Sequence, residues 1–112
     1  MTERILVVDD EQNIRRSLEI TLEGEGFTVE SVGTGEEALT IVAADPPDAV
    51  FLDIMLPGVD GMEVLRRLQA EHPRLPVVMI SGHATVARAV EATRLGAFDF
   101  VEKPFTSERI LL

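Results

Sequence analysis

The chain of 112 residues is long enough to bury one hydrophobic core, and with 46% hydrophobic and 27% charged residues it has a globular composition. It contains no cysteine, which excludes disulfides and thiolate metal sites and is compatible with a reducing cytosol. Ten Lys and Arg against 20 Asp and Glu give a net charge of -10, which disfavours direct binding to a nucleic acid backbone.

Targeting and membrane signals are missing from the sequence. No apolar run reaches membrane-spanning length, and Met1-Thr2-Glu3-Arg4 has neither the basic start nor the apolar core of a signal peptide. We therefore expect residues 1–112 to form one soluble, cytoplasmic domain that contacts neither membrane nor nucleic acid.

The first half of the chain alternates between strand and helix patterns. The apolar run 5–8 predicts a buried strand that ends at Asp9-Asp10. The next stretch predicts a helix, because apolar residues recur every four positions and glycines follow: Ile14, Leu18 and Leu22, then Gly24 and Gly26. Residues 27–32 alternate like a strand with one wet face. Thr34 and Glu37 have capping-box spacing, so a second helix is predicted from there to Pro46-Pro47.

The central strand is predicted where the apolar run 49–52 stops at Asp53 and the turn residues Pro57-Gly58 follow. A charged group in a buried sheet needs partners, so we expect Asp53 at the carboxyl edge of the sheet, where loops can supply them. A third helix follows, with Asp60 and Glu63 as its predicted caps. Its predicted inner face is Met62, Val64, Leu65 and Leu68.

The last third repeats the pattern. The apolar run 77–80 predicts a strand ending at Ser81-Gly82, and a helix follows until Gly96. Phe98 and Phe100 alternate with Asp99 and Glu102 in a fifth strand that ends at Lys103-Pro104. Residues 106–112 begin a helix and end after less than two turns.

This order predicts an α/β fold, a doubly wound parallel sheet of five strands with helices on both faces. Strands one, three and four are apolar throughout and belong in the middle, which gives the established flavodoxin-like order 2-1-3-4-5. The winding reverses between strands one and three, and Asp9, Asp10 and Asp53 all fall at the crevice opened there. Ser81 and Lys103 follow on the next two strand ends.

Three carboxylates in one crevice require a cation. Two like charges 4 Å apart cost roughly 4 kcal/mol at an effective dielectric constant of about 20. Ligands that are all oxygen suit Mg²⁺, and Lys103 alone cannot balance three negative charges. A carboxylate nucleophile with a metal, a lysine and the Ser81 hydroxyl suits phosphoryl transfer to an aspartate.

Four motifs lie at these strand ends: Ile5-Leu6-Val7-Val8-Asp9-Asp10-Glu11, Asp53-Ile54-Met55-Leu56-Pro57-Gly58-Val59-Asp60-Gly61, Ile80-Ser81-Gly82 and Phe100-Val101-Glu102-Lys103-Pro104-Phe105. Together they resemble the receiver domain of response regulators in bacterial two-component systems. The segments 81–85 and 96–100 are most similar to receivers of NtrC-type, sigma-54-dependent activators.

The resemblance implies a signalling switch rather than a conventional turnover enzyme. Asp53 would accept a phosphoryl group from a sensor histidine kinase and then lose it slowly by autodephosphorylation. Mg²⁺ would be bound by Asp10, by Asp53, by the backbone carbonyl of Met55 and, through water, by Asp9.

The resemblance also assigns residues that respond to phosphorylation. Lys103 would pair with the phosphate, Ser81 would move onto it, and Phe100 would rotate inward after it. The fourth helix, fifth strand and last helix would then change shape, form a homodimer interface and control an output that we expect to be transcriptional. The output domain and the rest of the last helix would lie beyond this chain. Alternatively, the apolar stub 110–112 promotes abnormal association.

The same residues also allow simpler explanations and rival functions. Asp10 alone could be a helix cap, Ser81-Gly82 a turn, Lys103-Pro104 a loop entry and Phe100 a packing residue. A phosphatase that turns over external substrates would want a second carboxylate two residues beyond Asp53, where Met55 stands. A receiver-like interaction module that works without phosphorylation is the stronger rival. Met55 also offers no good hydrogen bond to water, which predicts slower phosphoaspartate hydrolysis than an amide would give at that position.

Overall fold

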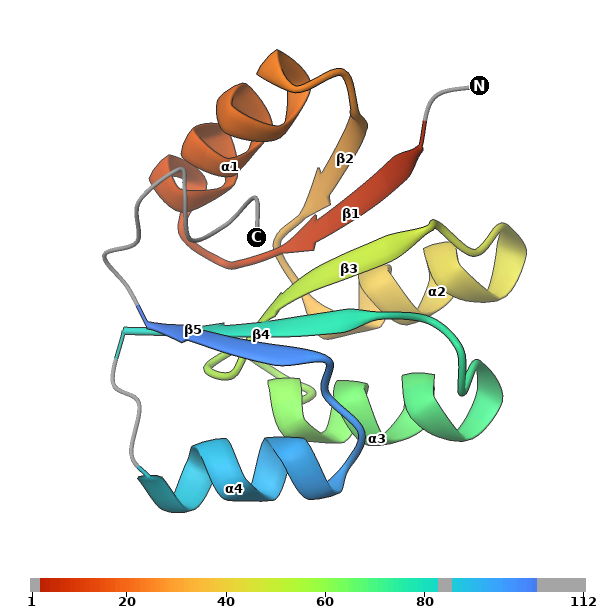
Figure 1. Cartoon of the computed structure of the whole chain (residues 1–112), viewed down its shortest axis with the longest axis vertical. Coiled ribbons are helices and arrows are strands. Elements are labelled where there is room, and N and C mark those ends of the chain that lie inside the picture. Colours follow the sequence, from red (N-terminus) through yellow and green to blue (C-terminus); the bar gives the residue numbers. More distant parts are fainter. Residues whose placement is uncertain (1–2, 83–85, 103–112) are drawn as a thin grey trace.

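The computed structural model describes residues 3–82 and 86–102, and this part of the chain forms five parallel strands and four helices (Figure 1). The sheet has the order β2-β1-β3-β4-β5, so the predicted α/β, flavodoxin-like arrangement is confirmed. The elements are β1 (Arg4–Val8), α1 (Gln12–Gly24), β2 (Thr28–Val32), α2 (Gly35–Ala44), β3 (Ala49–Asp53), α3 (Gly61–Glu71), β4 (Val77–Ser81), α4 (Val86–Arg94) and β5 (Asp99–Glu102). Lys103, His83 and the predicted last helix lie outside the described residues.

The two faces of the sheet have separate cores because successive strand residues point to opposite sides. On β1, Leu6 and Val8 pack in the larger core with residues from α2, α3 and α4, whereas Ile5 and Val7 pack in the smaller core with Leu18 of α1. All four of these β1 residues are at most 6% exposed. A strand that is apolar at every position is therefore explained by a sheet covered on both faces, as predicted.

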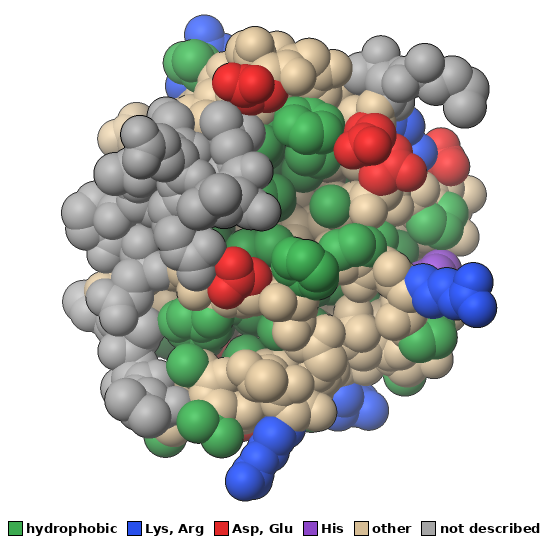
Figure 2. All heavy atoms as spheres, in the orientation of Figure 1, with side chains coloured by type: hydrophobic (Ala, Val, Ile, Leu, Met, Phe, Trp, Pro, Cys, Tyr) green, Lys and Arg blue, Asp and Glu red, His purple; other side chains and the backbone are tan. Residues whose placement is uncertain are grey.

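The side of the sheet beside α1 also carries an apolar groove. Among the described residues, α1 is the helix that contributes to the core on this side. In the view of Figure 2, apolar side chains are gathered over the middle of the molecule. The apolar residues that line the groove are Ile5, Leu22, Phe27, Ala49, Phe51, Pro76, Val78 and Phe98.

The start of α2 confirms the cap predicted for Thr34, and the start of α3 contradicts the cap predicted for Asp60. The side chain of Thr34 accepts a hydrogen bond from the backbone N–H of Glu37 at 3.2 Å, as the capping box predicts. Asp60 lies at the start of α3, but its side chain makes no capping bond. The prediction of a cap by Asp60 and Glu63 is wrong: the Glu63 carboxylate accepts from Arg66 and Arg67, and Asp60 makes no side-chain capping bond.

The start of the last strand differs from the prediction, which placed Phe98 within it. Phe98 precedes β5 and is 71% exposed, whereas Val101 is 3% exposed and packs in the core beside α1. Phe100 is half-buried against the opposite core. None of the helices in the described residues is long and apolar enough to cross a membrane.

Candidate functional site: an acidic cluster at the carboxyl edge

Asp53 ends the central strand and is almost completely buried, at 3% exposure. One residue beyond the strand, the N–H of Ile54 still donates to the carbonyl of Ile80 on β4 at 3.0 Å. The N–H of Met55 then turns back and donates to Oδ1 of Asp53 at 3.1 Å. Asp53 therefore lies where regular pairing stops and a turn begins, at the predicted edge of the sheet.

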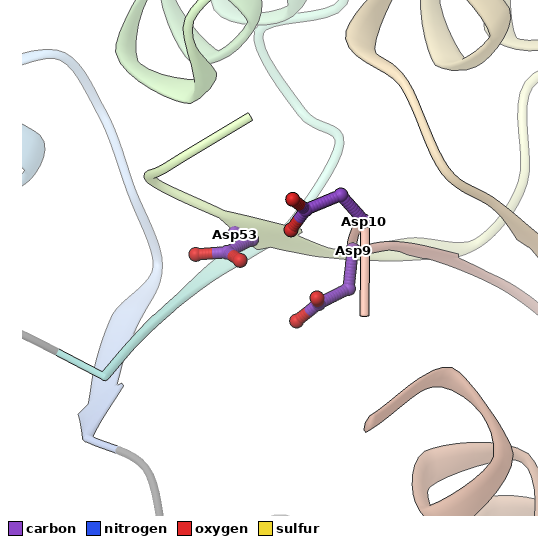
Figure 3. Close-up of side chains that lie close together, drawn as sticks. All are labelled: Asp9, Asp10 and Asp53. Carbon is purple, nitrogen blue, oxygen red and sulfur yellow. The ribbon is translucent and has the colours of Figure 1, made fainter. Parts of the chain in front are cut away.

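Asp9 and Asp10 approach Asp53 because β1 and β3 are neighbours. Val8 is paired with Leu52, so the residues that follow them, Asp9 and Asp53, leave adjacent strand ends. One carboxylate oxygen from each of the three aspartates lies within 4.8 Å of the others (Figure 3). Asp9 is fully buried, whereas Asp10 is exposed. The predicted convergence of the three carboxylates, here called the acidic cluster, is confirmed.

The turn after β1 is held by hydrogen bonds of Asp9 rather than by a cap from Asp10. Oδ1 of Asp9 accepts the N–H of Glu11 at 2.8 Å, and the N–H of Asp9 donates to the carbonyl of Val32 at 3.1 Å. The residue at the N-cap of α1 is Glu11. The simpler explanation of Asp10, that it caps this helix, is therefore wrong.

Arg15 is a residue of the site that the sequence reasoning missed. Its Nη1 donates to the backbone carbonyl of Asp9 at 2.6 Å. A Cβ at Gly33 would lie 3.2 Å from the same nitrogen, so the absence of a side chain at Gly33 leaves room for the guanidinium. A usable signal was present: a basic residue in the first turns of a helix opposes the helix dipole, which indicates a partner elsewhere.

The acidic cluster fits a hard divalent cation. All of its side-chain donors are carboxylate oxygens, and their mutual distances of up to 4.8 Å allow one ion to contact all three. Three like charges this close repel one another unless a cation offsets them, and two of the three side chains are withdrawn from water. The donor set and its burial therefore suit Mg²⁺ better than a soft metal.

The other predicted site residues are only partly placed. Ser81 ends β4, next to β3, and is 1% exposed, so it shares the carboxyl edge with Asp53. Phe100 lies on β5, paired with Met79 of β4. The Met55 side chain is 59% exposed, while its backbone is in the turn with Asp53. Lys103 lies outside the described residues.

Comparison with known proteins identifies the family. The sequence profile of the response regulator receiver domain matches residues 5–112. The chain belongs to this family.

Individual relatives of this receiver domain agree with the family match. Nitrogen assimilation regulatory protein NtrX of Azorhizobium caulinodans is 44% identical over 114 residues, which cover 100% of this chain and 25% of that protein. C4-dicarboxylate transport transcriptional regulatory protein DctD of Rhizobium meliloti is 38% identical over 107 residues, which cover 96% of this chain and 23% of that protein. The chain thus spans about a quarter of the length of these two curated relatives.

A solved structure extends the likeness to the fold. The crystal structure of the receiver domain of NtrX from Brucella abortus is 45% identical, with a TM-score of 0.90, and the match covers 96% of this chain and 91% of that one. The resemblance to NtrC-type activators is confirmed by NtrX and DctD. This receiver domain is therefore a two-component signalling domain, and domains of this family receive their signal from sensor histidine kinases.

Proposed function

We propose that this receiver domain is a cytoplasmic, phosphorylation-activated switch that accepts a phosphoryl group on Asp53 from a sensor histidine kinase, with Mg²⁺ as cofactor. The observation that supports this most is the position of Asp53, which is 3% exposed and has carboxylate oxygens of Asp9 and Asp10 within 4.8 Å. A buried carboxylate is costly, and three close together need a cation such as Mg²⁺ to offset their charge.

In the proposed reaction a carboxylate oxygen of Asp53 attacks the phosphorus of a phosphohistidine. The P–N bond breaks, the imidazole leaves with its electron pair and takes up a proton, and Asp53 carries an acyl phosphate. Asp10, Asp53, the carbonyl of Met55 and, through water, Asp9 would hold Mg²⁺, which supplies the positive charge that offsets the carboxylates and phosphoryl oxygens. The N–H of Met55 donates to Oδ1 of Asp53, which would help to orient the attacking carboxylate.

The phosphoryl group would be detected by residues on the neighbouring strand ends. Ser81 is buried at the end of β4 and would donate its hydroxyl to a phosphoryl oxygen, and Lys103 would pair with the phosphate. Phe100 is half-buried and would move inward as Ser81 moves, because both lie on the paired strands β4 and β5. Such a ligand shifts the population toward a state that already exists, by as much as it binds that state better.

The output would be read from the face formed by α4, β5 and the helix proposed to follow. Val90 on α4 is 45% exposed, and Arg94 in the last turn of the same helix is exposed. We propose that this face forms a homodimer and controls a transcriptional output domain beyond this chain. The relatives support this because NtrX is named a regulatory protein of nitrogen assimilation and DctD a transcriptional regulatory protein.

Dephosphorylation would be slow because of Met55. Water must attack the phosphorus to restore the Asp53 carboxylate and release inorganic phosphate. The exposed Met55 side chain, two residues from Asp53, has no group that orients such a water. Met55→Asn should shorten the lifetime of the phosphoaspartate several-fold, on the order expected for a single added hydrogen bond. An unchanged or longer lifetime would contradict this role for Met55.

Intact-mass analysis after incubation with acetyl phosphate and Mg²⁺ tests the proposed function directly. Wild type should gain the mass of one phosphoryl group, and Asp53→Asn should gain none. Asp60→Asn is the matched control, because Asp60 precedes α3 in the same connection but its side chain makes no capping bond. Wild type that stays unmodified in Mg²⁺, and also with a phosphorylated histidine kinase, would instead support a receiver-like interaction module that works without phosphorylation.

A further inference from the structure

Gly61, the first residue of α3, packs directly on the end of the central strand. A Cβ built at Gly61 would overlap the backbone oxygen of Asp53 and would lie 2.7 Å from the oxygen and 2.8 Å from the Cα of Ile54. Real Cβ atoms essentially never come within 3.0 Å of such neighbours. All three of these atoms belong to the backbone, so no side chain can rotate away to make room.

The glycine is needed for space rather than for its backbone angles. In the described residues, positive φ angles occur at Gly26, Gly58 and Gly96, but not at Gly61. Gly61 is buried, and its N–H donates to the carbonyl of Ile54 at 3.0 Å. The start of α3 is therefore both hydrogen-bonded to and in van der Waals contact with the peptide that follows Asp53.

This contact adds a second support for the strand end beside its pairing with β4. The N–H of Ile54 donates to the carbonyl of Ile80 on β4, and the carbonyl of Ile54 accepts from the N–H of Gly61 on α3. Ile54 is the residue between Asp53 and Met55, whose N–H donates to the Asp53 carboxylate. A shift of the Ile54 peptide would therefore move Asp53 relative to Asp9 and Asp10, whose position depends on β1 instead.

We propose that Gly61 is a positioning residue for the phosphoacceptor: the absence of its side chain lets α3 press on the Asp53–Ile54 backbone and hold the Asp53 carboxylate within reach of the cation shared with Asp9 and Asp10. This inference rests on the proposed function and goes beyond it, because it assigns part of the site's geometry to the start of a helix. Metal affinity depends on such supporting contacts, and their loss typically costs about 10- to 100-fold.

The test measures Mg²⁺ affinity by isothermal titration calorimetry on Gly61→Ala and wild type. Gly61→Ala should bind Mg²⁺ about 10- to 100-fold more weakly. It should also accept a phosphoryl group from acetyl phosphate about 100-fold more slowly, because misplacing a reacting group by about 1 Å has an effect of that size. If the variant does not fold in buffer, both proteins are measured in trimethylamine N-oxide, which favours the compact state.

Two control variants separate positioning from general destabilisation. Leu68→Ala removes a buried side chain two turns further along α3, so it should lower the melting temperature but leave Mg²⁺ affinity within about twofold of wild type. Gly24→Ala adds a Cβ where nothing lies within 4 Å and should change neither quantity by much. Unchanged Mg²⁺ affinity and labelling rate in folded Gly61→Ala would overturn the positioning role alone. Wild type that neither binds Mg²⁺ nor labels at Asp53 would overturn the proposed function and this inference together.

Discussion

The two edges of the sheet handle charge in opposite ways. At the amino edge, charges of opposite sign meet in water: Nη1 of Arg4 lies 3.2 Å from Oδ2 of Asp45, with 38% and 76% of these side chains exposed. The backbone N–H of Arg4 also donates to Oδ2 of Asp48 at 2.7 Å. At the carboxyl edge, Asp9 and Asp53 carry the same charge and are buried. At the amino edge opposite charges stabilise the fold, whereas at the carboxyl edge like charges are gathered in a way that suits a bound cation.

This difference separates residues that stabilise the fold, such as Arg4 with its partners, from residues whose burial lowers its stability, such as Asp9 and Asp53. Buried like charges reduce stability, and proteins commonly accept such a cost at functional sites. The described buried polar or charged residues are Asp9, Asp53 and Ser81, and all three lie at the carboxyl edge. Burial of polar groups at one edge of an otherwise apolar sheet is thus the structural sign of the site, and it can be tested by changing the charge at each edge.

Mg²⁺ should have the largest effect on stability, because it acts on the carboxyl edge as a whole. At a concentration of 100 times its dissociation constant, a ligand that binds only the folded state adds about 2.7 kcal/mol to the free energy of unfolding. The measurement is urea denaturation with and without MgCl₂ at constant ionic strength. Asp48→Ala at the amino edge should keep the whole increment, and Asp9→Asn should lose most of it. An equal gain from NaCl would contradict a specific site.

Asp53→Asn should stabilise the protein in the absence of Mg²⁺. Removing one of three like charges relieves repulsion of roughly 4 kcal/mol per pair at an effective dielectric constant of about 20. The lost hydrogen bonds of the carboxylate and the cost of burying an amide offset most of this, so we expect a net gain of about 1–2 kcal/mol. The same substitution should abolish phosphorylation, so stability and function would change in opposite directions. Urea denaturation without Mg²⁺ checks this, with Asp60→Asn as the control for loss of a carboxylate outside the acidic cluster. A loss of stability in Asp53→Asn would show that hydrogen bonds to its carboxylate outweigh the repulsion.

Asp48→Ala should lower the stability of the protein, whereas Asp53→Asn raises it, and the change should be smaller. It removes the acceptor for the backbone N–H of Arg4 at the exposed start of β1, which should cost about 0.5–1 kcal/mol of unfolding free energy. Asp45→Ala breaks an exposed ion pair with the same Arg4 and should cost less, about 0–0.5 kcal/mol. Thermal denaturation of both variants would rank them. If either substitution stabilised the protein, the contrast between the two edges would be lost.

The sequence predicted the fold and the acidic cluster because both follow from local patterns. Apolar runs that end at Asp9, Asp53 and Ser81 fix which residues leave the sheet, and parallel pairing brings those ends to one edge. The contacts of Arg15 and Gly61 could not be predicted, since each joins a helix to a strand end in another part of the fold. The arginine is unfavourable near a helix start, and such a local conflict indicates a tertiary contact. Gly61 is the first residue of α3, where a glycine gives no comparable signal.

The errors in the sequence-based prediction have the same physical origin. Asp60 and Glu63 have the spacing of a cap, but Glu63 makes hydrogen bonds of 2.6–2.8 Å with Arg66 and Arg67, and the carbonyl of Ile54 accepts the N–H of Gly61. Phe98 was predicted as part of the fifth strand, but β5 begins after it at Asp99 and Phe98 is exposed. In both cases the local pattern does not encode where the rest of the fold places the residue.

The smallest expected effect on stability is that of Glu63. Its carboxylate is bound by Arg66 and Arg67 on an exposed face of α3, which is a third arrangement of charge. Hydrogen bonds from Arg66 and then Arg67 lower the pKa of Glu63 from 4.5 to about 2. A carboxyl group whose pKa is lower in the folded state stabilises the fold above the unfolded pKa, and this contribution is lost as the pH falls from about 4.5 through 2. Because the group is exposed and screened by solvent, the effect should be smaller than that of any substitution above.

Glu63→Gln should therefore flatten the pH dependence of stability between pH 4.5 and 2 relative to wild type. Urea denaturation at pH 7, 4.5 and 3 measures this difference, and Glu71→Gln at the exposed end of the same helix is the matched control. High salt should reduce the difference at Glu63, because screening weakens exposed pairs of opposite charge. The same salt should raise the free energy of unfolding of the Mg²⁺-free wild type, because it screens the repulsion within the acidic cluster. If high salt instead lowered this free energy, like-charge repulsion would not govern the acidic cluster. The contrast between charges of opposite sign and charges of like sign would then fail.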